Sequence, residues 1–245
     1  MNRMNDLNCL LAEKLVEDIK KDYEASGIAV AIIDKSGKTQ YEKFWGVRDL
    51  ESGKEVNGDT IFGLASVTKS FTALSIMQLE EKGIIDLDAP ISQYIPEFTN
   101  KNQSKKVTVR HLLSHAGGFF PLPRILVGNV AESLGLDEEK DGDFAYNDAV
   151  AQEGVKLVAE RLDAQTKENG LNGQPGEYLS YCNDGFGLLS DIIRRYGGEP
   201  SYADYLVKHV LKPLGMERSF CDFVRPSKDE NAATLYKKVD GVMRG

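Results

Sequence analysis

Ser66-Val67-Thr68-Lys69 is the stretch from which both the fold and the chemistry of this chain are best predicted. It opens the apolar-periodic run of residues 71–83, which predicts a helix from residue 66 to about 82. Residues three apart on a helix share a face, so the Ser66 hydroxyl and the Lys69 ammonium should meet in the first turn. A desolvated lysine can take the serine proton, which predicts acyl transfer with Ser66 as nucleophile. The alternative is an ordinary helix N-cap at Ser66 with an exposed lysine.

A second candidate motif is Tyr181-Cys182-Asn183, which follows the turn signal Pro175-Gly176. Tyr181 could bring a phenolic oxygen to the Ser–Lys pair as base or proton shuttle, and Asn183 could hold a substrate amide and contact Lys69. The alternative is a core tyrosine followed by an N-cap, at Asn183 or at the next residue, for a helix over residues 186–193.

Together with their surroundings, these motifs resemble the serine β-lactamase and penicillin-binding protein superfamily. The nearest branch holds class C β-lactamases, D-alanyl-D-alanine carboxypeptidases and family VIII-like esterases. Five blocks occur in the family order and span most of residues 27–236. They are the nucleophile block 59–73, the following segment 87–98, the Leu-Leu-Ser-His-x-x-Gly loop within 107–118, the Tyr-x-Asn block within 175–189, and the Pro-Leu-Gly-Met segment within 210–220.

The resemblance implies a role for each matching residue. Ser66 is expected to form the acyl-enzyme, Lys69 to activate it, Tyr181 to share the proton transfers, and Asn183 to position the substrate amide. The backbone N–H of Ser66 is expected to be one oxyanion donor. Cys182 replaces the usual serine, which should affect packing only.

The resemblance also implies an α/β (α+β) fold, with an antiparallel sheet flanked by helices and a helical subdomain. The expected parts are residues 1–83, with a helix at 5–25, a hairpin at 27–48 and the nucleophile helix; a mostly helical 84–195; and 196–245, including a helix at 201–212. The family's third motif, Lys-Thr-Gly or His-x-Gly downstream of Tyr181, is missing. We therefore expect an incomplete sheet in a truncated chain, and a C-terminal remainder of the same protein as the partner that completes it.

Composition narrows the function classes. The 245 residues carry a net charge of −8, which argues against a nucleic-acid partner. No apolar stretch reaches the roughly 18 residues of a membrane span, and no signal peptide is visible. We expect no cofactor, no metal, and no disulfide among the three cysteines. Residues 137–148 loosely resemble a calcium loop, but surface acids are the better interpretation.

The resulting hypothesis is a serine hydrolase acting on a β-lactam, a D-amino-acid peptide or a small ester. The alternative is a penicillin-recognising homologue that binds a ligand or wall peptide without turnover. His115 follows Ser114 directly and could suggest a Ser–His pair, but adjacent residues rarely face each other. We expect His115 to belong to a structural loop near the cleft.

Overall fold

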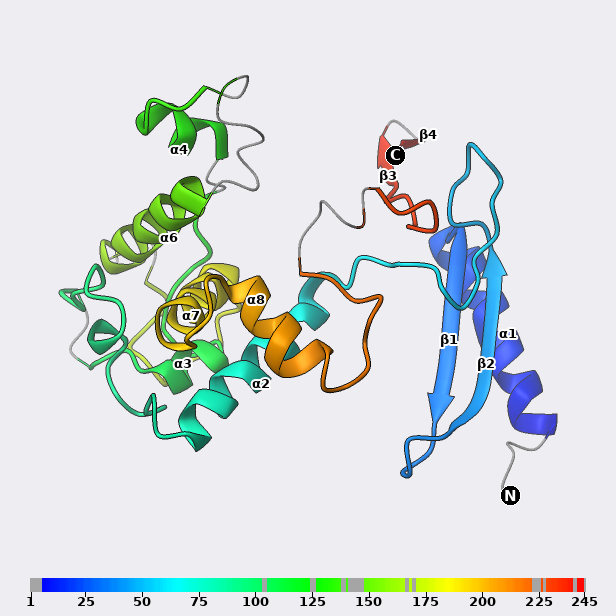
Figure 1. Ribbon diagram of the computed structural model, residues 1–245, viewed down its shortest axis with the longest axis horizontal. Helices are drawn as coiled ribbons and strands as arrows, with labels where there is room; N and C mark the ends of the chain where they lie inside the picture. The colour runs from blue at the N-terminus through cyan, green and yellow to red at the C-terminus, as the bar shows by residue number, and fades with distance from the viewer. Residues whose placement is uncertain are drawn as a thin grey trace. The chain divides into compact units, whose positions relative to one another are not determined.

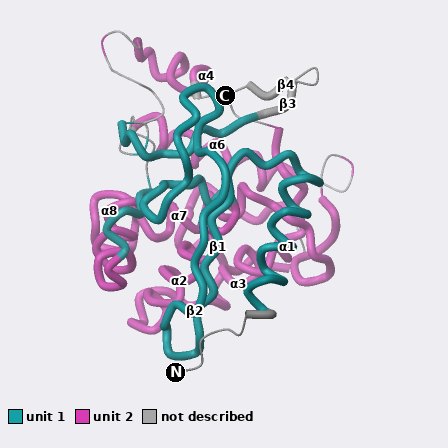
Figure 2. Tube along the Cα trace, turned by 90° about the vertical axis from the view of Figure 1, so that its right-hand side faces the viewer, with its two compact units in different colours: residues 1–65, 216–245 teal, residues 66–215 magenta. Residues whose placement is uncertain are grey.

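The computed structural model describes residues 6–102, 105–123, 127–137, 140, 148–165, 168, 171–221, 226, 228–239 and 242–244. The chain forms two compact units, one of residues 1–65 with 216–245 and one of residues 66–215 (Figure 2). The three-part division expected from the sequence stays a prediction. The acidic segment compared with a calcium loop lies mostly outside the described residues.

The first unit is built on an antiparallel hairpin. Helix α1 (Asp6–Tyr23) precedes β1 (Gly27–Ile33) and β2 (Thr39–Gly46), as expected for a helix at 5–25 and a hairpin at 27–48 (Figure 1). The strands pair from Gly27↔Gly46 to Ile33↔Thr39. Asp34 closes the turn by accepting the Ser36 N–H at 2.8 Å. The β-branched run of β1 favours an extended strand over a helix.

The C-terminal segment returns to this unit and packs beside residues 47–61. Ala232 bridges to Ile61, and the Thr234 N–H donates to the carbonyl of Arg48 at 2.9 Å. The Asp49 carboxylate accepts from the Thr234 hydroxyl at 2.8 Å and from the Tyr236 phenol at 2.9 Å. Strands β3 (Lys237–Val239) and β4 (Val242–Arg244) form a second antiparallel pair.

The second unit is helical. It begins within the 3₁₀ turn η1 (Ala65–Val67), since Ala65 is the last residue of the first unit's N-terminal part. The elements that follow are α2 (Thr68–Glu81), the 3₁₀ turn η2 (Ile91–Gln93), α3 (Val109–Leu113), α4 (Val127–Ser133), α6 (Asp148–Asp163), α7 (Asn183–Tyr196), α8 (Tyr202–Leu206) and the π-helix η4 (Val207–Leu211). Local signals set several ends. Helix α2 is followed by Gly83 at φ +67°, α3 is capped by Thr108, and α8 is capped by Ser201.

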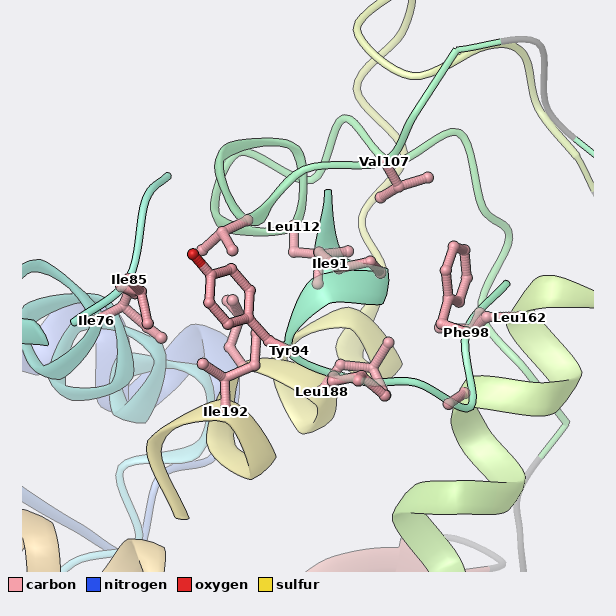
Figure 3. Packing of buried hydrophobic residues seen from close by; sticks show 14 of the residues in the cluster. Ile76, Ile85, Ile91, Tyr94, Phe98, Val107, Leu112, Leu162, Leu188 and Ile192 are labelled. Carbon is pink, nitrogen blue, oxygen red and sulfur yellow. The ribbon is translucent and has the colours of Figure 1, made fainter. Parts of the chain in front are cut away.

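The core of this unit lies between α2, α7 and the loops that join them (Figure 3). Helix α2 buries Thr72, Ser75, Ile76 and Leu79, which follow helical spacing. Fully buried partners come from α7 and from the segment after α2, namely Leu188, Leu189, Ile192, Ile193, Ile91, Ile95 and Phe98. The buried side of α2 fixes the direction of its first turn, which carries Lys69 and directly follows Ser66.

Two further properties concern the whole described chain. None of its helices combines the length and apolar character needed to cross a membrane. Of the three cysteines, all free thiols, Cys182 is buried, and Cys9 and Cys221 are partly exposed.

Candidate active site

Ser66 lies in the 3₁₀ turn η1, directly before helix α2. The preceding residue, Ala65, has φ +44°, a left-handed conformation that is uncommon for a residue with a Cβ. Strained backbone of this kind is concentrated at functional sites. The turn leaves the Ser66 side chain exposed, where a reacting molecule can approach it.

Lys69 lies one turn further on and contacts the serine. Its Nζ donates to Ser66 Oγ at 3.0 Å, as the three-residue spacing predicts. The N-cap alternative is wrong, because the residue before α2 is Val67 and no side chain caps that end. Lys69 is half-buried, so the expectation of an exposed lysine is wrong as well.

Tyr181 comes from the segment before α7 and completes a three-residue cluster. Its phenol donates to Ser66 Oγ at 2.8 Å across 115 positions of sequence. The tyrosine side chain is 45% exposed, so its interpretation as a core residue is wrong. Ser66 Oγ is therefore contacted by Tyr181 and by Lys69.

A short stretch of backbone pairing places Tyr181. Residues 115–119 run beside 171–180, with N–H to carbonyl bonds of 2.8 Å from Ser180 to His115, from Gly176 to Ala116 and from Asn172 to Gly118. Gly118 has φ +79°, and a Cβ there would lie 2.3 Å from the carbonyl oxygen of Gly173. A side chain at this position would force the two segments apart.

The cluster has a distinct electrostatic character. Lys69 Nζ lies 4.9 Å from the ring centroid of Tyr181 and 5.6 Å from that of Phe186, on the electron-rich faces that favour a cation. The hydrogen bond with Lys69, followed by the one with Ser66, holds the pKa of Tyr181 below its ordinary value of 10.0. The site therefore stabilises the ionised phenol more than water does, and in that form the phenolate can accept a proton from the serine.

The other two residues of the Tyr-x-Asn motif differ in environment. Asn183 is exposed as the first residue of α7, so it neither caps the helix nor belongs to the core. Cys182 is buried, and burial raises the pKa of its thiol to about 11. A buried thiol of high pKa is unreactive, as expected for a residue that only packs.

Sequence analysis placed His115 in a loop near the cleft but did not predict its contact with the cluster. The ring of His115 lies 4.2 Å from the ring of Tyr181, centroid to centroid, and 4.9 Å from that of Phe186. Ser114 turns away and donates to the carbonyl of Arg110 at 2.8 Å, so there is no Ser–His pair. The His115–Tyr181 contact joins segments 66 positions apart, and neither periodicity nor spacing could have indicated it.

Within the described part of the chain, no group of three or more His, Cys, Asp or Glu side chains could hold a metal ion. The chemistry of the described site is that of a hydroxyl, an ammonium and a phenol.

Known proteins resemble this chain over most of its length. The family described as Beta-lactamase matches residues 12–244. Esterase EstB of Burkholderia gladioli is 32% identical over 213 residues, which are 85% of this chain and 50% of the esterase. Penicillin-binding protein 4* of Bacillus subtilis is 30% identical over 209 residues, which are 84% of this chain and 40% of that protein. The chain thus spans about half the length of the curated relatives it matches.

Solved structures agree with the sequence comparisons. The octameric penicillin-binding protein homologue from Pyrococcus abyssi is 30% identical and superposes with a TM-score of 0.76. The matched region is 98% of this chain and 50% of that protein's chain. A class C beta-lactamase is 22% identical and superposes with a TM-score of 0.71. The matched region is 95% of this chain and 55% of the beta-lactamase chain. The expected fold, antiparallel strands with helices and a helical subdomain, is confirmed.

Proposed function

Because the chain belongs to the beta-lactamase family, we propose that it acts as a serine hydrolase through an acyl-enzyme on Ser66. The observation that carries the proposal is the position of Ser66 Oγ, 3.0 Å from the Lys69 ammonium and 2.8 Å from the Tyr181 phenol. A serine hydroxyl is a weak nucleophile, and an adjacent base activates it. The family relatives support a hydrolase of this kind.

In the proposed first step Tyr181 is the base. Loss of the phenolic proton reverses the hydrogen bond between the two oxygens, so that Ser66 donates to the phenolate. Oγ then attacks the substrate carbonyl carbon while its proton passes to Tyr181. Lys69 remains beside both oxygens, and its charge stabilises the phenolate before attack and the developing negative charge on Oγ.

The tetrahedral intermediate collapses when Tyr181 returns the proton to the leaving nitrogen or oxygen. The carbonyl re-forms as the bond to the leaving group breaks, and the acyl group stays on Ser66. In the second step a water molecule attacks the acyl carbon and gives its proton to Tyr181. Tyr181 then returns this proton to Ser66 Oγ as the acid leaves. The Ser66 N–H, at the N-terminal end of a helical segment, is the proposed oxyanion donor, and loss of one such donor typically slows turnover by about 10²–10³. We assign substrate positioning to the exposed amide of Asn183.

The substrate class follows from the chemistry of acyl transfer. Among the relatives, one is named an esterase and others are named penicillin-binding proteins or beta-lactamases. We propose a small ester, a β-lactam or a D-amino-acid peptide, each of which presents a carbonyl carbon with a departing oxygen or nitrogen.

The proposal is tested by covalent labelling. The chain is incubated with a fluorophosphonate or a penicillin, and the adduct is located by intact mass and peptide mapping. We expect one adduct on Ser66, none in Ser66→Ala, and an unchanged adduct in Ser70→Ala, which alters an exposed serine in the first turn of α2. A Ser66→Ala chain that is still labelled would contradict the nucleophile assignment. A wild-type chain that binds penicillin without an adduct would favour the non-catalytic alternative.

A further inference from the structure

His115 holds the backbone on both sides of Tyr181. Its carbonyl accepts the Ser180 N–H at 2.8 Å, and its Nδ1 accepts the Cys182 N–H at 3.2 Å. The residue itself has φ +54°, a left-handed conformation that a histidine rarely adopts without cause. One strained residue thus holds the backbone N–H groups of the two residues next to Tyr181.

The imidazole also supports the phenol ring. The rings of His115 and Tyr181 are inclined by 32° with centroids 4.2 Å apart, and the ring of Phe186 lies 4.9 Å from the imidazole. A rigid planar surface limits the rotation of the tyrosine side chain. Since the phenol must stay 2.8 Å from Ser66 Oγ, a rotation about χ1 that swings the ring away would break the cluster.

This arrangement requires a neutral imidazole. Nδ1 can accept the Cys182 N–H only when it carries no proton, so the ring proton is on Nε2. Burial, and then the positive charge of Lys69, keep the pKa of His115 below its ordinary value of 6.5. The other titratable groups around the ring are Tyr181 and Cys182, and His111 of α3 lines the same small cavity.

We infer that His115 is a positioning residue for Tyr181, holding the phenol against Ser66 while its imidazole is neutral and releasing it when Nδ1 is protonated. The inference rests on the proposed function and adds an acid-sensitive control to it. Protonation turns Nδ1 from acceptor to donor, so it opposes the Cys182 N–H. It also places a second positive charge near Lys69.

Two substitutions separate the hydrogen bond from the ring. His115→Asn keeps an acceptor near the position of Nδ1 and tolerates the left-handed backbone, but it removes the ring. His115→Phe keeps a ring but removes the acceptor, which leaves the Cys182 N–H unpaired. The matched control is His209→Asn, which changes the histidine of η4 that bonds to Glu199.

The first readout is the titration of the Tyr181 phenol by nuclear magnetic resonance of ¹³C-labelled tyrosine, assigned with Tyr181→Phe. In both His115 variants we expect the Tyr181 pKa to rise by about one unit, and Ser66 labelling by a fluorophosphonate to slow about tenfold at neutral pH. In the wild-type chain the Tyr181 resonance should shift a second time as His115 is protonated below pH 6.5. His209→Asn should leave all three observations unchanged.

The inference is overturned if the Tyr181 titration is the same in both His115 variants as in the wild type, or if its resonance ignores His115 protonation. The wild-type titration needs no variant, so it decides the question even where a substitution prevents folding. Absence of any labelling on Ser66 would contradict the proposed function alone, because the Tyr181 titration requires no turnover.

Discussion

Removing only the phenolic oxygen of Tyr181 tests the proposed base directly. In Tyr181→Phe the ring remains, so the contacts with His115 and the Lys69 cation are retained. What is lost is the hydroxyl 2.8 Å from Ser66 Oγ. A positioned general base typically contributes 10²–10⁴ in rate. Because Lys69 still contacts Oγ at 3.0 Å, we expect the lower end of that range, a loss of about a hundredfold.

The assay is the rate at which a fluorophosphonate labels Ser66, followed by intact mass at pH 8 with the probe in excess. The control Tyr178→Phe removes the hydroxyl of an exposed tyrosine three residues upstream and should label at the wild-type rate. The Tyr181 side chain is 45% exposed, so the unfolding temperature of Tyr181→Phe should stay within about 2 °C of the wild type.

The pH dependence sharpens this prediction. The pKa of Tyr181 lies below its ordinary value of 10.0. The ionised fraction of the phenol therefore grows as pH rises toward that pKa and levels off above it. The wild-type labelling rate should follow that fraction, and the rise should vanish in Tyr181→Phe. Equal rates in the two chains across the pH range would refute the assignment of Tyr181 as base.

Two further predictions concern carboxylates that stabilise the fold. The Asp191 side chain of α7 is 1% exposed and bonds two arginines at 2.6–2.8 Å. Asp191→Asn should therefore lower the free energy of unfolding, measured in urea, by about 2–3 kcal/mol. This is less than the full value for a buried ion pair, because both arginines reach water. Asp88→Asn breaks an exposed ion pair with similar distances and should have no measurable effect, and equal losses in the two variants would contradict this reasoning. Hydrogen bonds from Ser52, Thr234 and Tyr236 lower the pKa of Asp49 below 3.8. The contribution of this carboxylate to stability is therefore complete at neutral pH and is lost as pH falls below 3.8. Asp49→Asn should therefore speed proteolysis of residues 231–239 at pH 7, and unchanged cleavage would show that the carboxylate does not hold that segment.

The pairing of Ser66 with Lys69 followed from a local rule, whereas the fold was predicted from the family resemblance. Three-residue spacing on a helix puts two side chains on one face. The hairpin was expected from the family resemblance, and the β-branched residues of β1 agree with a strand there. The helix expected at 201–212 is present, but it continues as a π-helix from Val207, a change of backbone bonding that side-chain periodicity does not encode.

The rest of the site depends on contacts between distant segments. Tyr181 was placed near Ser66 through a family resemblance, because no periodic pattern relates positions so far apart in the chain. The left-handed backbone of Ala65 and His115 could not be predicted, since alanine disfavours it and only a small minority of histidines adopt it. Such conformations are imposed by surrounding structure. Of the four residues other than glycine that have positive φ in the described chain, one precedes Ser66 and one contacts Tyr181.

The pairing of residues 115–119 with 171–180 also bears on how this part of the chain can evolve. It brings together the two ends of a long excursion that contains α4 and α6, so the excursion begins and returns at nearly one place. Closure entropy grows only with the logarithm of loop length, and doubling a loop costs about 0.6 kcal/mol. Lineages can therefore lengthen, shorten or exchange the excursion without altering the backbone pairing that places Tyr181.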